Sequence, residues 1–204
     1  MKSVDSYKTV IENYSAEIKI KKSTFIAQVY PMESAEKLSE LINEVKKKYF
    51  DSAHNPFAYR IGLTKDIFRY NDDGEPSGTA GKPILEAIDR YQLTNILIVV
   101  TRYFGGTKLG VGRLKRAFLE SAVEVLKNSK ITEKFIYNKI KISFDYIYIN
   151  KVLNFIKKKN IRILNNESGD KVNLVCEVRL SKYDDFLENL NNITSGSFRV
   201  INNE

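Results

Sequence analysis

The stretch "NILIVVT" at residues 95–101 restricts the fold of this chain more than any other. A short continuous apolar run between polar residues is typical of a strand that is covered on both faces. We therefore expect these residues to form the central strand of a sheet. The sequence does not by itself order the other strands of that sheet.

Alternating and helical patterns surround this strand. "NYSAEIKIKKSTFIAQVYP" predicts two strands joined by a turn near residues 21–23, and "FAYRIGL" and "IFRYND" predict a hairpin. Ser34 is a suitable N-cap for a helix that runs to about Phe50. Pro83 suits the first turn of a second helix, and a third is expected from about Gly112 to Asn128.

The last third of the chain has a different rhythm. Strand and helix patterns alternate as βαββαβ within about 70 residues, which is the split βαβ, or ferredoxin-like, arrangement. The sequence therefore predicts an α+β protein of two domains, residues 1–130 and residues 131–204, with the boundary at "NSKIT".

Composition excludes several classes of protein. Of the 204 residues 43% are hydrophobic, which is enough for ordinary cores, but no apolar run is long enough to span a membrane. The N-terminus lacks the apolar segment of a secretion signal, so we expect a cytoplasmic protein. One cysteine and one histidine cannot assemble a usual zinc site, and neither a metal nor a cofactor is expected. The net charge of +8 is only a weak indication of nucleic-acid binding.

Two loops collect seven of the ten glycines, "DDGEPSGTAGKP" at 72–83 and "TRYFGGTKLGVGRLKR" at 101–116. Glycine permits close backbone approach, and a loop that runs into a helix presents free N–H groups to an anion. The second loop adds five cations without an acidic residue, and two aromatic rings that can stack on bases. We predict an anion or nucleic-acid site formed by Arg60, Lys82, Arg102, Tyr103, Phe104, Gly105, Gly106, Lys108, Gly110, Gly112, Arg113, Lys115 and Arg116.

The first loop admits a catalytic interpretation. It is not a nucleotide-binding P-loop, because Pro76 occupies the position of the first glycine of that motif and Pro83 occupies the position of its hydroxyl residue. Its carboxylates could hold magnesium, although they are also typical of turns. A hydroxyl nucleophile there needs the only histidine as its base. We assign no catalytic residue. The candidate functional loop comprises His54, Asp72, Asp73, Gly74, Glu75, Ser77, Gly78, Thr79 and Gly81.

The segments "DSAHNPFAYRIG" and "NDDGEPSGTAGKPILEAIDRYQLTNILIVVTRYFGGTKLGVGRLKRAF", in this order, resemble the IMPACT family, whose bacterial members include the YigZ proteins. The resemblance implies an N-terminal domain of the ribosomal-protein type with a left-handed βαβ crossover, followed by a ferredoxin-like domain. It also implies nucleic-acid or ribosome association in translation, without established catalysis. Arg113 and Lys115 depart from the family pattern, which has a glycine and an apolar residue there, and both add positive charge.

Three hypotheses follow. The first is a protein that binds RNA or the ribosome and modulates translation, with a protein partner in translation control as a further possibility. The second is a hydrolase or phosphotransferase that acts at the loop from Asp72 to Lys82. The third is a protein–protein adaptor that uses the C-terminal sheet and the tyrosines of "NKIKISFDYIYI". The sequence sets neither RNA specificity nor oligomeric state.

Overall fold

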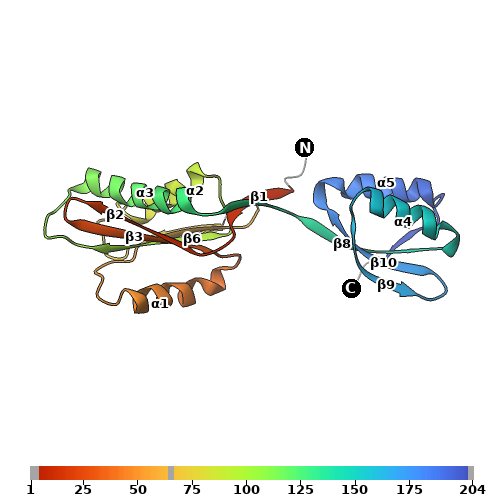
Figure 1. The fold of residues 1–204 in the computed structure, drawn as a ribbon, viewed down its shortest axis with the longest axis horizontal. Helices are drawn as coiled ribbons and strands as arrows, with labels where there is room; N and C mark the ends of the chain where they lie inside the picture. The colour runs from red at the N-terminus through yellow and green to blue at the C-terminus, as the bar shows by residue number, and fades with distance from the viewer. Residues whose placement is uncertain (1–4, 64–66, 202–204) are drawn as a thin grey trace. The chain divides into compact units, whose positions relative to one another are not determined.

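The computed structural model describes residues 5–63 and 67–201, which form two compact units. One unit contains residues 7–134, and the other contains residues 5–6 and 135–201. The molecule is therefore an α+β protein of two domains, as predicted (Figure 1). No helix among these residues is long and apolar enough to cross a membrane.

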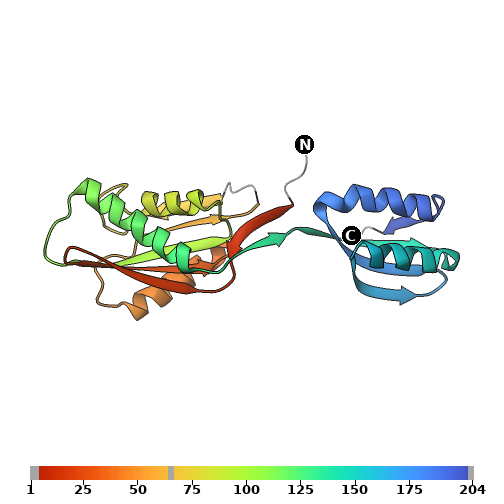
Figure 2. The ribbon, with the colours of Figure 1, turned by 45° about the horizontal axis from the view of Figure 1, so that its top comes forward.

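The N-terminal unit is built on a five-stranded sheet of order β2-β3-β6-β4-β5, in which every neighbouring pair is antiparallel. Helix α1 covers one face, and α2 and α3 lie side by side on the other (Figures 1 and 2). The elements are β2 (Tyr14–Ile20), β3 (Ser23–Pro31), η1 (Ala35–Lys37), α1 (Leu38–Lys48), β4 (Phe57–Ile61), β5 (Ile67–Asn71), α2 (Gly81–Arg90), β6 (Ile96–Tyr103) and α3 (Val111–Asn128).

Strand β6 is the central strand of this sheet, and its first seven residues are buried. Ile96, Ile98 and Val100 pack toward α2 and α3, whereas Leu97 and Val99 pack toward α1. The prediction of a strand covered on both faces is thus confirmed. The alternation has a consequence for the site, because Arg102 continues the face toward α2 and α3 while Tyr103 continues the other.

The C-terminal unit has the strand order β11-β8-β10-β9 with antiparallel neighbours, and its helices cover one face. This is the ferredoxin-like arrangement that the sequence predicts. Cys176 lies in its core, where burial raises the pKa of the thiol to about 11. The elements are β8 (Tyr137–Phe144), η2 (Tyr146–Tyr148), α4 (Ile149–Lys158), β9 (Arg162–Ser168), β10 (Val172–Arg179), η3 (Leu180–Lys182), α5 (Tyr183–Ile193) and β11 (Arg199–Ile201).

A two-stranded sheet of β1 (Ser6–Val10) and β7 (Ile131–Phe135) was not expected from the sequence. Val10 at the end of β1 is fully buried in the core of the N-terminal unit, and Thr9 donates its hydroxyl to the carbonyl of Asn95. Pattern analysis missed β1 because its residues alternate weakly. The handedness of the crossovers stays a prediction.

Asp5 fastens the first described residues to the C-terminal unit. The Arg179 guanidinium donates two hydrogen bonds to the Asp5 carboxylate, and it stacks on Phe135 at 3.8 Å from the ring centroid. The hydrogen bond from Arg179 lowers the pKa of Asp5 from 3.8 to about 2. A group whose pKa is lower in the folded state stabilises the fold above its unfolded pKa, and this contribution disappears as the pH falls through the folded value.

We therefore expect Asp5→Asn to reduce the stability of the C-terminal unit by a constant amount between pH 7 and 5. The difference from the parent protein should shrink as the pH falls from about 4 toward 2, where Asp5 itself becomes protonated. Urea unfolding of both proteins at several pH values measures this. Asp170→Asn, which removes an exposed carboxylate from a turn of the same unit, is the control. A difference that stays constant down to pH 2 would contradict the assigned ion pair.

Candidate nucleic-acid interface

Asp72 organises the first glycine loop from within. Its carboxylate accepts hydrogen bonds from the N–H groups of Gly78 at 2.8 Å, Ala80 at 3.0 Å and Gly81 at 2.8 Å. The last two of these N–H groups belong to the start of α2, where a helix has no intrahelical acceptors. The predicted anion site of this loop is therefore filled by the protein's own carboxylate, which is a structural role.

Asp73 and His54 hold the loop against the segment before β4. Asp73 accepts a hydrogen bond from the N–H of Asn55 at 2.7 Å, and its backbone carbonyl lies 2.7 Å from Nδ1 of His54. A carbonyl oxygen only accepts, so Nδ1 carries the hydrogen and Nε2 of the neutral ring keeps its lone pair. Gly74 packs on this ring, and a Cβ there would lie 3.0 Å from it.

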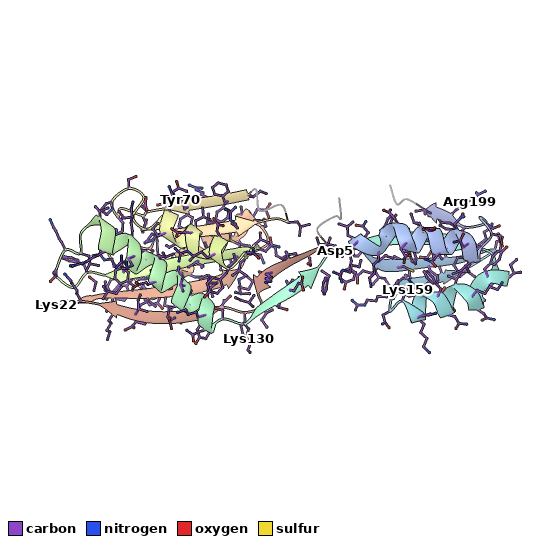
Figure 3. The ribbon with its side chains drawn as sticks, turned by 90° about the horizontal axis from the view of Figure 1, so that it is seen from above. Asp5, Lys22, Tyr70, Lys130, Lys159 and Arg199 are labelled. Carbon is purple, nitrogen blue, oxygen red and sulfur yellow. The ribbon has the colours of Figure 1, made fainter. Side chains whose placement is uncertain are left out.

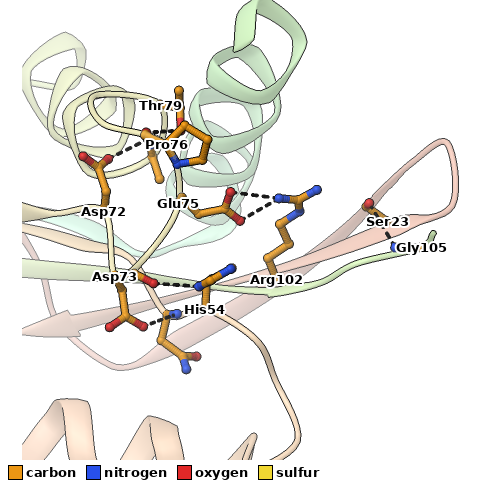
Figure 4. A network of polar contacts seen from close by, with 11 residues as sticks. Ser23, His54, Asp72, Asp73, Glu75, Pro76, Thr79, Arg102 and Gly105 are labelled. Atoms are coloured by element: carbon orange, nitrogen blue, oxygen red, sulfur yellow. Dashed lines mark hydrogen bonds and ion pairs between the residues drawn. The ribbon is translucent and has the colours of Figure 1, made fainter. Parts of the chain in front are cut away.

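Glu75 and Arg102 form a buried ion pair beneath the two glycine loops. The side chains are only 2% and 9% exposed, and Nη1 of Arg102 lies 2.7 and 2.9 Å from the two carboxylate oxygens (Figure 4). The guanidinium also lies 5.6 Å from the ring centroid of Phe25 and 5.5 Å from that of Phe104. Its Nε is buried, and none of the residues that the structure describes provides an acceptor for it.

The second glycine loop packs on the β2–β3 turn. A Cβ at Gly105 would lie 1.8 Å from the backbone oxygen of Lys22, so only glycine fits there. The loop ends at Gly110, which precedes α3 with φ at 77° and provides no side-chain cap. The first turn of α3 also contains no acidic residue. The start of α3 thus differs from the start of α2, because no side chain within the described ranges caps it.

A pocket of about 510 Å³ joins the two loops. The segment before β4 contributes Ala53 and His54, the first loop contributes Glu75 and Pro76, and β6 contributes Arg102. The remaining lining comes from the second loop and the start of α3, and consists of Phe104, Lys108, Leu109, Gly110, Val111 and Leu114.

Exposed cations gather at this end of the N-terminal unit. Helix α3 begins there, and the β2–β3 turn with Lys22 lies at the same end (Figures 1 and 3). We call the following six side chains the cationic end; all are exposed, and no residue among 5–63 and 67–201 forms an ion pair with them: Lys21, Lys22, Lys108, Arg113, Lys115 and Arg116. Lys82 is also exposed, but it lies in the first turn of α2.

Three residues of the predicted anion site lie elsewhere or are already engaged. Arg60 is paired with Asp89 and lies opposite Ile96, at the far end of β6 from Arg102. Tyr103 faces the α1 side, where its hydroxyl donates to Asp51; this hydrogen bond raises the pKa of Tyr103 to about 12. Arg102 is neutralised by Glu75. We therefore correct the predicted site by removing Arg60, Tyr103 and Arg102 from the surface offered to phosphates.

The residues of the catalytic alternative are mostly committed to internal contacts. Thr79 is buried and donates its hydroxyl to the carbonyl of Pro76, while Ser77 is exposed. The carboxylates of Asp72, Asp73 and Glu75 each accept hydrogen bonds from the protein. No cluster of potential metal ligands occurs in the part of the chain that the structure describes. These contacts favour a structural interpretation of the loop.

The adaptor hypothesis relied on tyrosines of the C-terminal unit. Tyr148 packs against the core, and Tyr146 donates its hydroxyl to the carbonyl of Gly169. Neither residue belongs to β8, whose residues on the face away from the helices include Lys139 and Lys141. The two tyrosines therefore do not form a binding face on the sheet.

Sequence analysis missed Lys21 and Lys22 as site residues. The turn that contains them was predicted, but its contact with Gly105 joins residues more than eighty positions apart. It also missed the apolar lining of the pocket, above all Leu109, Val111 and Leu114. In the sequence these residues are indistinguishable from the buried stripe of a helix.

Comparison with known proteins identifies both domains. Residues 21–126 match the Impact N-terminal domain, and residues 142–197 match a domain of unknown function, DUF1949. The chain is 36% identical to the IMPACT family member YvyE of Bacillus subtilis over 94% of its own length and 88% of that protein. It is 27% identical to the IMPACT family member YigZ of Escherichia coli over 89% and 90%. A crystal structure of a hypothetical protein is similar with a TM-score of 0.69, 25% identity and 98% coverage of both chains. The domain matches, the relatives and the shared fold together establish that the chain belongs to the IMPACT family.

Proposed function

We propose that this protein binds RNA, within the ribosome or free, through the cationic end of its N-terminal unit, and that it modulates translation in this way. The observation that carries the proposal is the group of six exposed cations for which the described part of the chain provides no ion-pair partner. An unpaired cation can release counterions from a phosphate backbone, whereas a paired one must first lose its own partner.

The position of these cations adds to the argument. Arg113, Lys115 and Arg116 lie in the first two turns of α3, where the helix dipole also favours negative charge. Lys108 and Lys22 lie in the loop and the turn beside them. Several elements thus contribute charge to one end of the unit, which suits a backbone that carries a phosphate at every nucleotide.

Replacement of Arg113, Lys115 and Arg116 by alanine tests the proposal. Each lost phosphate contact weakens binding about 5-fold near 100 mM salt, so the triple variant should bind ribosomal RNA roughly 100-fold more weakly. Filter binding measures this. The control removes the same charge from α4 of the C-terminal unit, by Lys151→Ala, Lys157→Ala and Lys158→Ala, and should bind normally. Equal affinity of the triple variant and the parent protein would reject the proposal.

A further inference from the structure

The pocket between the two glycine loops combines apolar walls with few polar groups. Pro76, Leu109 and Leu114 contribute apolar surface, and Phe104 contributes a ring that is 52% exposed. Its volume of about 510 Å³ lies within the range of roughly 300–1,000 Å³ that is typical of small-ligand sites. An exposed aromatic ring at the mouth of such a pocket is suited to stack on a planar ligand.

His54 and Arg102 are two of the polar side chains that line the pocket, beside Glu75 and Lys108. His54 and Arg102 are partners in an antiparallel bridge, so their side chains project from the same face of the sheet. When the His54 ring is neutral, Nε2 is the acceptor, because Nδ1 donates to the carbonyl of Asp73. Arg102 also lines the pocket, but its guanidinium is paired with Glu75 and its Nε is buried, so it forms part of the pocket wall.

The start of α3 adds an anion site at the same pocket. Gly110 and Val111 line the pocket, and the helix has no capping side chain and no acidic residue in its first turn. Lys108 lies beside them. The free N–H groups of such a helix start favour a phosphate. The apolar pocket and the exposed ring of Phe104 are observations independent of the helix start, so the helix start does not carry the argument alone.

We propose that this pocket binds an unstacked nucleobase together with its 5′ phosphate. The base stacks on Phe104, the phosphate contacts the start of α3 and Lys108, and Nε2 of His54 accepts a hydrogen bond from the base edge. An acceptor complements a base that carries an exocyclic amino group, such as adenine or cytosine, rather than uracil. The assignment of RNA as the natural source of the nucleotide rests on the proposed function; the pocket chemistry does not.

Titration with free nucleotides tests the pocket without RNA. The probes are adenosine 5′-monophosphate, uridine 5′-monophosphate and ribose 5-phosphate. NMR of the full chain measures the binding of each. We expect adenosine monophosphate to bind most tightly and to shift the amides of the second glycine loop. Phe104→Ala should weaken it about 5-fold or more, because one stacked base contributes at least about 1 kcal/mol. Phe50→Ala, which removes an 85% exposed ring outside the pocket, should not.

Val111→Glu tests the phosphate contact with a substitution that should not destabilise the fold. A carboxylate in the first turn of a helix stabilises the helix but occupies the place of the phosphate. It should weaken binding of adenosine monophosphate about 10-fold or more and leave adenosine unaffected. Equal binding of ribose 5-phosphate and adenosine monophosphate, or indifference of both to Phe104→Ala, would overturn the assignment of a base site.

A second arm uses a short 5′-phosphorylated RNA and the same RNA with an abasic 5′ nucleotide. If RNA is the source, the abasic RNA should bind at least 10-fold more weakly to the parent protein, and Phe104→Ala should abolish this difference. RNA binding that ignores the abasic change and Phe104→Ala overturns the pocket proposal but leaves the proposed function standing. Binding of free adenosine monophosphate without RNA binding supports the pocket and rejects the proposed function.

Discussion

Glu75→Gln is expected to lower the free energy of unfolding of the N-terminal unit by about 3 kcal/mol, because removing one member of a buried ion pair leaves the other charge uncompensated. The side chain of Glu75 is 2% exposed, and its two carboxylate oxygens accept hydrogen bonds from Nη1 of Arg102. The amide of glutamine provides one acceptor but no negative charge. Urea unfolding monitored through hydrogen exchange of the β6 amides measures the stability of the N-terminal unit separately from that of the C-terminal unit.

Two controls make this prediction specific. Glu86→Gln breaks an exposed ion pair with Arg90 on α2 and should change stability by less than about 0.5 kcal/mol. The double variant Glu75→Leu with Arg102→Met replaces the buried pair by apolar side chains and should recover most of the loss, since such replacements are often neutral. A double variant as unstable as Glu75→Gln would show that the pair does more than neutralise Arg102. A small effect of Glu75→Gln would contradict the buried pair itself.

Gly105→Ala is expected to destabilise the N-terminal unit by about 3 kcal/mol, the upper end of what overpacking costs. Its Cβ would lie 1.8 Å from the backbone oxygen of Lys22, and backbone cannot yield as a flexible side chain can. Relief requires the second glycine loop to move away from the β2–β3 turn. Thermal unfolding measures the loss of stability, and exchange of the loop amides locates it.

Gly112→Ala is the matched control for this change. Gly112 lies in the first turn of α3, and no atom lies within 4 Å of the Cβ that alanine would add. Alanine has the higher helix propensity, so this variant should be unchanged or slightly more stable. A Gly105→Ala variant as stable as Gly112→Ala would contradict the packing of the loop on Lys22.

Much of the fold could be predicted from periodicity. The run at β6, the hairpin of β4 and β5, and the C-terminal βαββαβ order all reflect local patterns that tertiary structure preserves. Strand β1 could not be predicted in this way, because it is short and is held in place by long-range contacts such as the hydrogen bond between Thr9 and Asn95. The two-stranded sheet with β7 was missed for the same reason.

The candidate site could be predicted in location but only partly in chemistry. The two loops that stand out in the sequence by their glycines line one pocket. Sequence alone does not distinguish a free cation from one that has a buried partner, because the partner Glu75 of Arg102 is twenty-seven positions away. The sequence likewise does not show that the carboxylate of Asp72 accepts the hydrogen bonds of the first N–H groups of α2. These long-range contacts decide which helix starts and cations remain available to an external anion.

The salt dependence of RNA binding tests the central claim most directly. If Lys108, Arg113, Lys115 and Arg116 meet phosphates, the logarithm of the association constant should fall against the logarithm of salt concentration with a slope of about −3 or steeper. The variant with Arg113, Lys115 and Arg116 replaced by alanine should have a slope shallower by about 2. A slope near zero, or the same slope in the variant and the parent protein, would contradict phosphate recognition by the cationic end.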